Sequence, residues 1–148
     1  MILYLDTSAL LKLYLAEPES DCVRGAVRDV EVCTHQVAWV EVHAGLAMAV
    51  RMGRLSDPDM DDHLRSFETD WGIMDVVGLD DALTRRAGGM ARQFGLRAYD
   101  SVHLAAAERV MITVGSGDFM FMGFDARLDS AARALGMTLP GAGKKSPR

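Results

Sequence analysis

Short apolar runs alternate with longer amphipathic stretches along this chain, and this alternation is the feature that most restricts its fold. The runs that read as strands cover residues 2–5, 30–34, 73–77 and 119–124, with a short final run at 137–139. Stretches of helical period and length separate the first four. This order is typical of βαβ units, in which helical crossovers join parallel strands. The sequence therefore predicts an α/β fold built on a parallel sheet.

Local start and stop signals place the helices between these runs. Thr7 or Ser8 can cap a helix directly after the first run, and Pro58 suits the first turn of a later helix. Glycines 53, 95 and 136 follow the last periodic residue of three segments and are typical helix ends. The helices predicted after the first one cover residues 19 to about 29, 36–52, 57–71, 80–94, about 99–110 and 126–135.

The length and composition fit one domain. A chain of 148 residues with 49% hydrophobic residues can bury a sizeable core. We expect a domain over residues 1–140 and a disordered tail over 141–148. Cys22 and Cys33 do not make a disulfide scaffold and are expected to be reduced core or near-core residues. The first apolar run is too short for a signal peptide or a membrane span, so a cytoplasmic protein without membrane contact is expected.

The net charge restricts the kind of ligand. It is −5 at pH 7, with an isoelectric point of about 5.3. Proteins that hold nucleic acid by its phosphates are usually basic. An acidic chain needs positive charge from elsewhere for such a role, and bound divalent cations are a ready source.

Four acidic residues are expected at one edge of the predicted sheet. Asp6 directly follows the first strand, and Asp125 directly follows the fourth. Glu41 lies in the first turns of the helix after the second strand, and Asp100 lies at the start of the helix after Gly95. Parallel sheets bind ligands at the carboxyl ends of their strands. These side chains should therefore converge if the first and fourth strands are neighbours.

Converging carboxylates point to a metal site, because they repel one another unless a cation lies between them. Oxygen ligands select hard ions, so Mg²⁺ is expected, with Mn²⁺ as an alternative. Such an ion can turn water into a nucleophile and stabilise charge that develops on a phosphate oxygen. It would also supply the positive charge that the acidic chain lacks.

Each acid also has a structural interpretation, so no single one is decisive. Asp6, Asp100 and Asp125 could cap helices, and Glu41 could be an exposed or ion-paired helix residue. The argument for function rests on the shared edge of the sheet.

Two further polar residues are interpreted as structural. Asp118 precedes the fourth strand, which places it in a turn at the opposite end from Asp125. His103 lies one helical turn after Asp100 and is followed by apolar residues, so a packed, hydrogen-bonded histidine is expected.

Three sequence blocks resemble the PIN-domain family, and especially the VapC toxins of bacterial toxin–antitoxin pairs. They span residues 4–20 (YLDTSAL onward), 96–105 (LRAYDSVHLA) and 124–136 (FDARL, then AA and LG). The likeness covers about residues 1–139, and Glu41 stands where the family places its helix glutamate. The first two blocks are specific, whereas the surroundings of Glu41 are generic.

This resemblance implies a fold, an activity and partners. The fold is a three-layer α/β/α sandwich on a parallel sheet, and the activity is a Mg²⁺- or Mn²⁺-dependent endoribonuclease that cuts tRNA, rRNA or mRNA. The implied partners are a second copy in a homodimer and a VapB-type antitoxin over the active site. The catalytic, metal-binding acids carried over from the family are Asp6, Glu41, Asp100 and Asp125. The residues that would hydrogen-bond to these ligands or contact the substrate are Thr7, Ser8 and Arg97.

One position departs from the family pattern. Many relatives have Thr or Ser two residues before the last acid, whereas this chain has Gly123. A hydroxyl that could orient water or the Asp125 carboxylate is therefore missing. We hypothesise that the resting site binds one ion and that RNA completes it. A titration that finds two tight Mg²⁺ ions without RNA would contradict this hypothesis.

Other functions are alternatives. A housekeeping RNA-processing nuclease would share these acids, and a catalytically silent RNA- or protein-binding module would keep the fold. Phosphatases of the haloacid dehalogenase type require a second Asp where this chain has Ser8, and no glycine-rich nucleotide loop follows the first strand. Basic residues that could guide an RNA backbone are Lys12, Arg51, Arg54, Arg92, Arg97 and Arg127.

Overall fold

A parallel four-stranded sheet lies at the centre of the computed structural model, which describes residues 1–141. The strands are β1 (Ile2–Leu5), β2 (Glu31–His35), β3 (Asp75–Val77) and β4 (Phe119–Met122). Their order is β3-β2-β1-β4, and each neighbouring pair is parallel. The predicted parallel α/β architecture is therefore confirmed. The tail predicted for 141–148 falls, beyond residue 141, outside the described residues.

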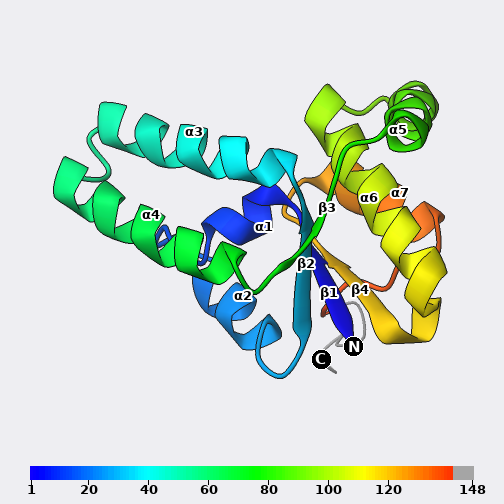
Figure 1. Ribbon diagram of the computed structural model, residues 1–148, viewed down its shortest axis with the longest axis horizontal. Helices are drawn as coiled ribbons and strands as arrows, with labels where there is room; N and C mark the ends of the chain where they lie inside the picture. Colours follow the sequence, from blue (N-terminus) through cyan, green and yellow to red (C-terminus); the bar gives the residue numbers. More distant parts are fainter. Residues whose placement is uncertain (142–148) are drawn as a thin grey trace, which may run out of the picture.

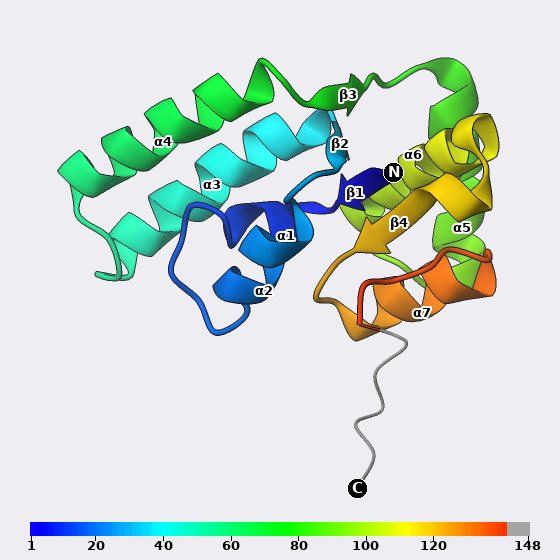
Figure 2. The same ribbon diagram turned by 90° about the horizontal axis from the view of Figure 1, so that it is seen from below.

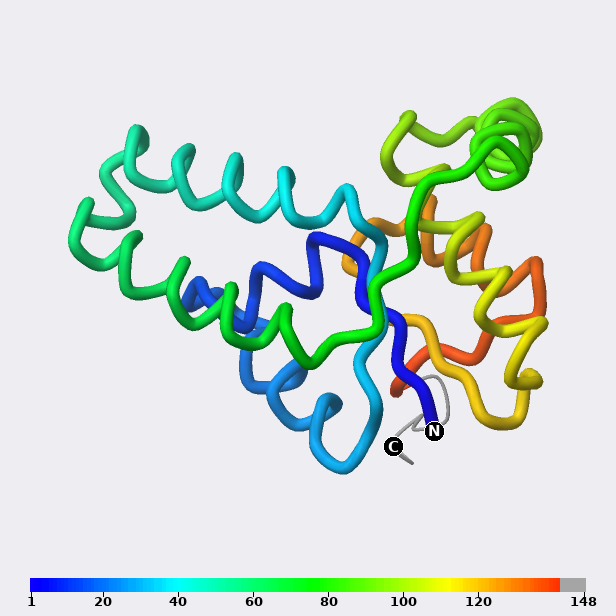
Figure 3. The backbone as a smooth tube through the Cα atoms, in the orientation of Figure 1, coloured from blue at the N-terminus to red at the C-terminus, as the bar shows by residue number. Residues whose placement is uncertain are grey.

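Helices cover both faces of the sheet and complete the predicted α/β/α sandwich (Figures 1 and 2). One face carries α1 (Thr7–Leu11), α2 (Ser20–Ala26), α3 (Val37–Arg51) and α4 (Asp57–Trp71). The other carries α5 (Asp81–Phe94), α6 (Ala98–Val114) and α7 (Ala126–Ala134), and a 3₁₀ turn, η1 (Ser116–Asp118), precedes β4. Helices α3 and α4 form a hairpin that extends beyond the sheet (Figure 3). None of the helices within residues 1–141 combines the length and apolar character needed to cross a bilayer.

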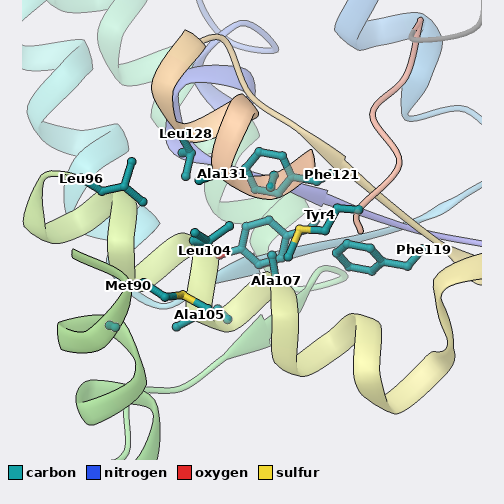
Figure 4. Packing of buried hydrophobic residues seen from close by; sticks show 14 of the residues in the cluster. Tyr4, Met90, Leu96, Leu104, Ala105, Ala107, Phe119, Phe121, Leu128 and Ala131 are labelled. Atoms are coloured by element: carbon teal, nitrogen blue, oxygen red, sulfur yellow. The ribbon is translucent and has the colours of Figure 1, made fainter. Parts of the chain in front are cut away.

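Strand β1 contributes side chains to both hydrophobic cores because successive residues of a strand point to opposite faces. Leu3 and Leu5 belong to the core beneath α1, α3 and α4. Tyr4 points to the other face, where its ring stacks on Phe121 with centroids 5.8 Å apart and packs with Leu104 and Leu128 (Figure 4). Burial on both faces explains why β1 reads as an uninterrupted apolar run.

Several helix ends agree with their sequence signals. The Ser56 hydroxyl accepts from the Asp59 N–H at the start of α4, with Pro58 in the first turn. Gly95 ends α5 at φ 63°, a left-handed conformation that favours glycine. Helix α6 is longer than predicted and continues to Val114, where Gly115 follows at φ 91°.

Several sequence expectations are wrong, and the predicted runs 73–77 and 19 to about 29 are shorter in the structure, as β3 and α2. The run 137–139 is not a strand. Thr138 makes only an isolated bridge to Met120, although Met137 and Leu139 are buried. Strand β4 ends at Met122, because the next loop turns away and the Phe124 N–H donates to a side chain instead. Cys33 is buried as expected, but Cys22 is exposed on α2.

Replacing Phe121 with alanine should strongly destabilise the fold. The side chain is 0% exposed and stacks on Tyr4, so its loss leaves a cavity, and we expect the free energy of unfolding to fall by about 3–5 kcal/mol. Urea denaturation measures this change. Ile112→Ala, at a side chain that is 72% exposed, is the control and should change stability by less than about 0.5 kcal/mol. Similar losses in both variants would contradict the assigned core.

Candidate functional site

The carboxyl edge of the sheet brings the four predicted acids to one end of the molecule. Strands β1 and β4 are neighbours, which places Asp6 beside the loop that leads to Asp125. The backbone N–H of Asp6 donates to the Met122 carbonyl at 3.2 Å. Glu41 lies in the second turn of α3, and Asp100 lies in the first turn of α6.

Asp6 is the most enclosed of these acids, with 3% of its surface exposed. Its Oδ1 atom accepts hydrogen bonds from the Ala9 N–H at 2.9 Å and from the Ser8 hydroxyl at 2.7 Å. Asp6 is therefore the cap of α1, and the expectation that Thr7 or Ser8 would cap this helix is wrong. The reason is that Asp6 keeps the extended backbone of β1, whereas Thr7 is already helical. Capping uses Oδ1 and leaves Oδ2 on the side of Gly123.

The charge on Asp6 is unfavourable in the metal-free protein. Burial raises the pKa of its carboxyl, and the nearby Asp100 carboxylate raises it further, against the lowering effect of the Ala9 and Ser8 hydrogen bonds. Asp100 raises this pKa although it comes 94 residues later in the chain. Such an environment favours a bound cation.

Glu41 is held by a buried polar chain. Its Oε1 atom accepts from the Thr7 hydroxyl at 2.7 Å and lies 2.8 Å from His103 Nε2. His103 Nδ1 lies 2.8 Å from the Tyr4 hydroxyl. Burial raises the pKa of Tyr4, so this hydroxyl keeps its proton and can donate to Nδ1, which leaves the Nε2–H to donate to Glu41. His103 is thus a packed, hydrogen-bonded residue, as predicted.

These hydrogen bonds also keep Glu41 ionised. Burial opposes the charge, but the hydrogen bonds from His103 and Thr7 hold the pKa of Glu41 below its ordinary value. The carboxylate that faces this edge of the sheet is therefore fixed in both position and charge.

Asp100 and Asp125 meet across the guanidinium of Arg97. Arg97 Nε donates to Asp100 Oδ2 at 2.9 Å, and its Nη2 lies 3.7 Å from Asp125 Oδ2. The three residues line an open depression of about 410 Å³ between the starts of α6 and α7. Asp125 Oδ1 caps α7 through the Leu128 N–H, whereas Asp100 caps nothing, because Arg97 is the N-cap residue of α6.

The metal-site assignment stays a prediction. Within residues 1–141, no three histidine, cysteine, aspartate or glutamate side chains are already arranged to hold an ion. The donor set still fits a hard ion, since it consists of carboxylate oxygens and includes Oδ2 of the largely buried Asp6. The guanidinium of Arg97 already places a positive charge between Asp100 and Asp125.

One acid that sequence reasoning did not single out lies at the same place. Asp129 is one helical turn after Asp125, and its Oδ1 is closed off from solvent and accepts no hydrogen bond from any described residue. A Cβ atom at Gly123 would lie 2.8 Å from Asp6 Oδ2 and 3.0 Å from Asp129 Oδ1. Burial, followed by the charges of Asp6 and Asp125, raises the pKa of Asp129 to about 6. The i,i+4 spacing from Asp125 was the available signal.

Lys12 was wrongly predicted to be available to RNA. Its Nζ pairs with Glu17 at 3.0 Å and with Glu19 at 2.9 Å, and it lies 4.8 Å from the centre of the Phe124 ring. This side chain is buried and fixes the loop after α1. Arg97 and Arg127, by contrast, are exposed at the depression.

The chain is similar in sequence and in fold to known proteins. Residues 3–133 match the profile of the PIN domain. The chain is 32% identical over 136 residues to Ribonuclease VapC45 of Mycobacterium tuberculosis (strain CDC 1551 / Oshkosh), a match that spans 91% of this chain and 92% of that protein. FitAcB from Neisseria gonorrhoeae superposes with a TM-score of 0.64 at 17% identity over 94% of this chain and 96% of that chain. A toxin–antitoxin complex from Klebsiella pneumoniae gives a TM-score of 0.59 at 15% identity over 83% and 86%.

Asp129→Asn should stabilise the metal-free protein at neutral pH. A pKa raised from 3.8 to about 6 means that ionising Asp129 disfavours the folded state; the effect is absent well below pH 3.8 and complete above about pH 6. Because solvent reaches part of the side chain, we expect a gain of about 1 kcal/mol in the free energy of unfolding. Urea denaturation with a chelator, at about pH 7.5 and about pH 4.5, measures it. An equal gain at both pH values would refute the electrostatic cause.

Proposed function

This chain belongs to the PIN domain family, and from this membership we propose that it is a metal-dependent endoribonuclease that acts as the toxin of a VapBC-type pair. The observation that carries the proposal is the placement of Asp6, Glu41, Asp100 and Asp125 at one carboxyl edge of a parallel sheet. The near full-length match to a protein named as a ribonuclease supports the same activity. The substrate we propose is tRNA, rRNA or mRNA.

The proposed cofactor is Mg²⁺, with Mn²⁺ as the alternative, because the donors are carboxylate oxygens. Asp6 and Asp100 would hold the ion, with help from Glu41 and Asp125. When bound, the ion supplies a Lewis acid that activates water and neutralises charge on the phosphate. Hydrolysis with the 3′ oxygen as leaving group would give products with a 5′-phosphate.

The residues around the acids fix their positions for this role. Ser8 and the Ala9 N–H hold one oxygen of Asp6, so the direction of the other oxygen is set before any ligand binds. Ser8 also accepts from the Phe124 N–H at 3.0 Å and thereby ties Asp6 to the loop after β4. His103 and Thr7 hold Glu41 in the same manner. Preorganised ligands of this kind reduce the reorganisation needed during the reaction.

Arg97 is proposed to exchange partners when RNA binds. In the free protein its guanidinium neutralises Asp100 and approaches Asp125. Its side chain is 81% exposed, so it can turn toward an RNA phosphate once another cation neutralises the two acids. Arginine suits this contact because its planar fork matches the phosphate oxygens.

A VapB-type antitoxin and a second copy of the chain are the proposed protein partners. The fold likeness to a toxin–antitoxin complex supports the first. Helix α3 exposes Val40 and Met48, and Met52 is exposed directly after it. Exposed apolar side chains along one element favour a protein contact. A housekeeping nuclease would share the active-site acids but would not need such an inhibitor.

Asp6→Asn should abolish metal-dependent RNA cleavage and leave the fold intact. Asparagine keeps the cap of α1 but removes the charge that holds a cation, so we expect cleavage to fall by about 100-fold or more. Cleavage of an end-labelled RNA with Mg²⁺ and with chelator measures the loss, and circular dichroism checks the fold. Asp118→Asn, at the opposite end of β4, is the matched control. If Asp6→Asn cuts RNA at the parent rate, the site is wrong.

Co-expression should separate the toxin from the housekeeping enzyme. We expect the chain to arrest growth when expressed alone, and the product of a short neighbouring gene to relieve the arrest and co-purify with the chain. Light scattering of the chain alone should give the mass of a dimer. Growth unaffected by active enzyme, with no binding by any neighbouring gene product, would favour the housekeeping role.

A further inference from the structure

The space beside Gly123 is filled by two acids that come from different elements. Asp6 follows β1, and Asp129 lies in the first turn of α7. Both Asp6 Oδ2 and Asp129 Oδ1 lie within 3.0 Å of the point that a Cβ atom at residue 123 would occupy. A serine or threonine therefore fits there only if a carboxylate moves, and Asp129 takes up part of the space that such a side chain would need.

Asp129 Oδ1 is an unsatisfied polar atom. It is closed off from solvent and has no hydrogen-bond partner among the described residues. Asp6 is almost fully buried, and both hydrogen bonds that its carboxylate accepts go to Oδ1. A buried carboxylate oxygen without a partner is costly, and a second carboxylate nearby adds to the cost because the two charges repel each other.

Three kinds of group could satisfy the two oxygens: a shared proton, a basic side chain or a metal ion. Within residues 1–141, no lysine or arginine pairs with Asp129 in the structure. A shared proton satisfies the pair only in the metal-free state. A divalent cation bound to Asp6 would neutralise both carboxylates, and unpaired carboxylate oxygens are its preferred ligands.

We propose that Asp129 is a metal ligand, and that its carboxylate gives the ion at Asp6 the oxygen contact that Gly123 cannot give. The proposal rests on the proposed function, because it requires the ion at Asp6. It changes the hypothesis drawn from Gly123: the site is not short of an oxygen donor, since one from α7 replaces the donor missing from the loop. Asp125 caps α7 and thereby fixes the turn that carries Asp129.

Mn²⁺ binding to the metal-free protein tests the proposal without an activity assay. Electron paramagnetic resonance of free Mn²⁺ gives the affinity, and water-proton relaxation gives the number of waters on bound Mn²⁺. We expect Asp129→Asn to bind Mn²⁺ about 10-fold more weakly. Asp129→Ala, which has no side-chain oxygen, should also bind more weakly and should gain one bound water on Mn²⁺. Asp118→Asn, which removes the same charge at the other end of β4, should bind as the parent does.

The outcomes separate the ligand role from the proposed function. If Asp6→Asn binds Mn²⁺ as tightly as the parent, the metal site itself is wrong. If Asp6→Asn loses binding while Asp129→Asn matches Asp118→Asn, the site stands and the role of Asp129 is overturned. Weaker binding by Asp129→Ala without a gained water on Mn²⁺ also overturns it, because the effect is then electrostatic at a distance or due to a shared proton.

A pair of compensating substitutions tests the link to residue 123. Gly123→Ser alone should weaken Mn²⁺ binding, because its Cβ would crowd Asp6 Oδ2 and Asp129 Oδ1. In the Asp129→Ala background the same change should instead strengthen binding, because the hydroxyl enters the vacated space. Melting temperatures with chelator check that each variant folds. The same effect of Gly123→Ser in both backgrounds would contradict the proposed exchange of ligands.

Discussion

The parallel pairing of β1 with β4 is the constraint on which the rest of the site depends. These strands come from opposite ends of the chain, and their register sets Asp6 beside the loop at 123–125. The hydrogen bond from Phe124 N–H to Ser8 joins residues 116 positions apart and closes this edge. The rings of Tyr4 and Phe121, which are paired residues of the two strands, stack on one face of the sheet. They resist a shift of register, since a slip of either strand by one residue would turn its ring to the other face.

A buried polar chain extends from this pair of strands to the site. Tyr4 contributes its ring to the core and its hydroxyl to His103, which in turn holds Glu41. Every polar group in this chain of contacts has a partner, which is the condition under which a buried network stabilises a fold. The same strand residue therefore serves core packing and the orientation of an acid on another helix.

The acids at the edge work against the stability of the metal-free protein. Burial raises the pKa values of Asp6 and Asp129, and so do the charges of other acids, which are Asp100 for Asp6 and both Asp6 and Asp125 for Asp129. The folded state therefore carries charges that it does not favour. Carboxylates with shifted pKa values that lie close together are typical of functional sites. A bound cation would remove the repulsion that remains between them in the folded protein. Arg97 offsets part of the repulsion at Asp100 and Asp125, but the pair at Gly123 lacks such a contact among the described residues.

The sequence by itself determined the parallel α/β class, the helix signals at Pro58 and Gly95, and the position of four acids after strands or at helix starts. These features are local or periodic, so neighbouring residues encode them. Only the tertiary structure decided that Asp6 caps α1, that Cys22 is exposed, and that residues 137–139 are buried without forming a strand. It also decided that Asp129 lies beside Gly123 together with Asp6, because that placement depends on the register of β1 against β4 and on the rotation of α7. The register and the rotation are set by packing between segments that are far apart in the sequence, so no local sequence pattern predicts them.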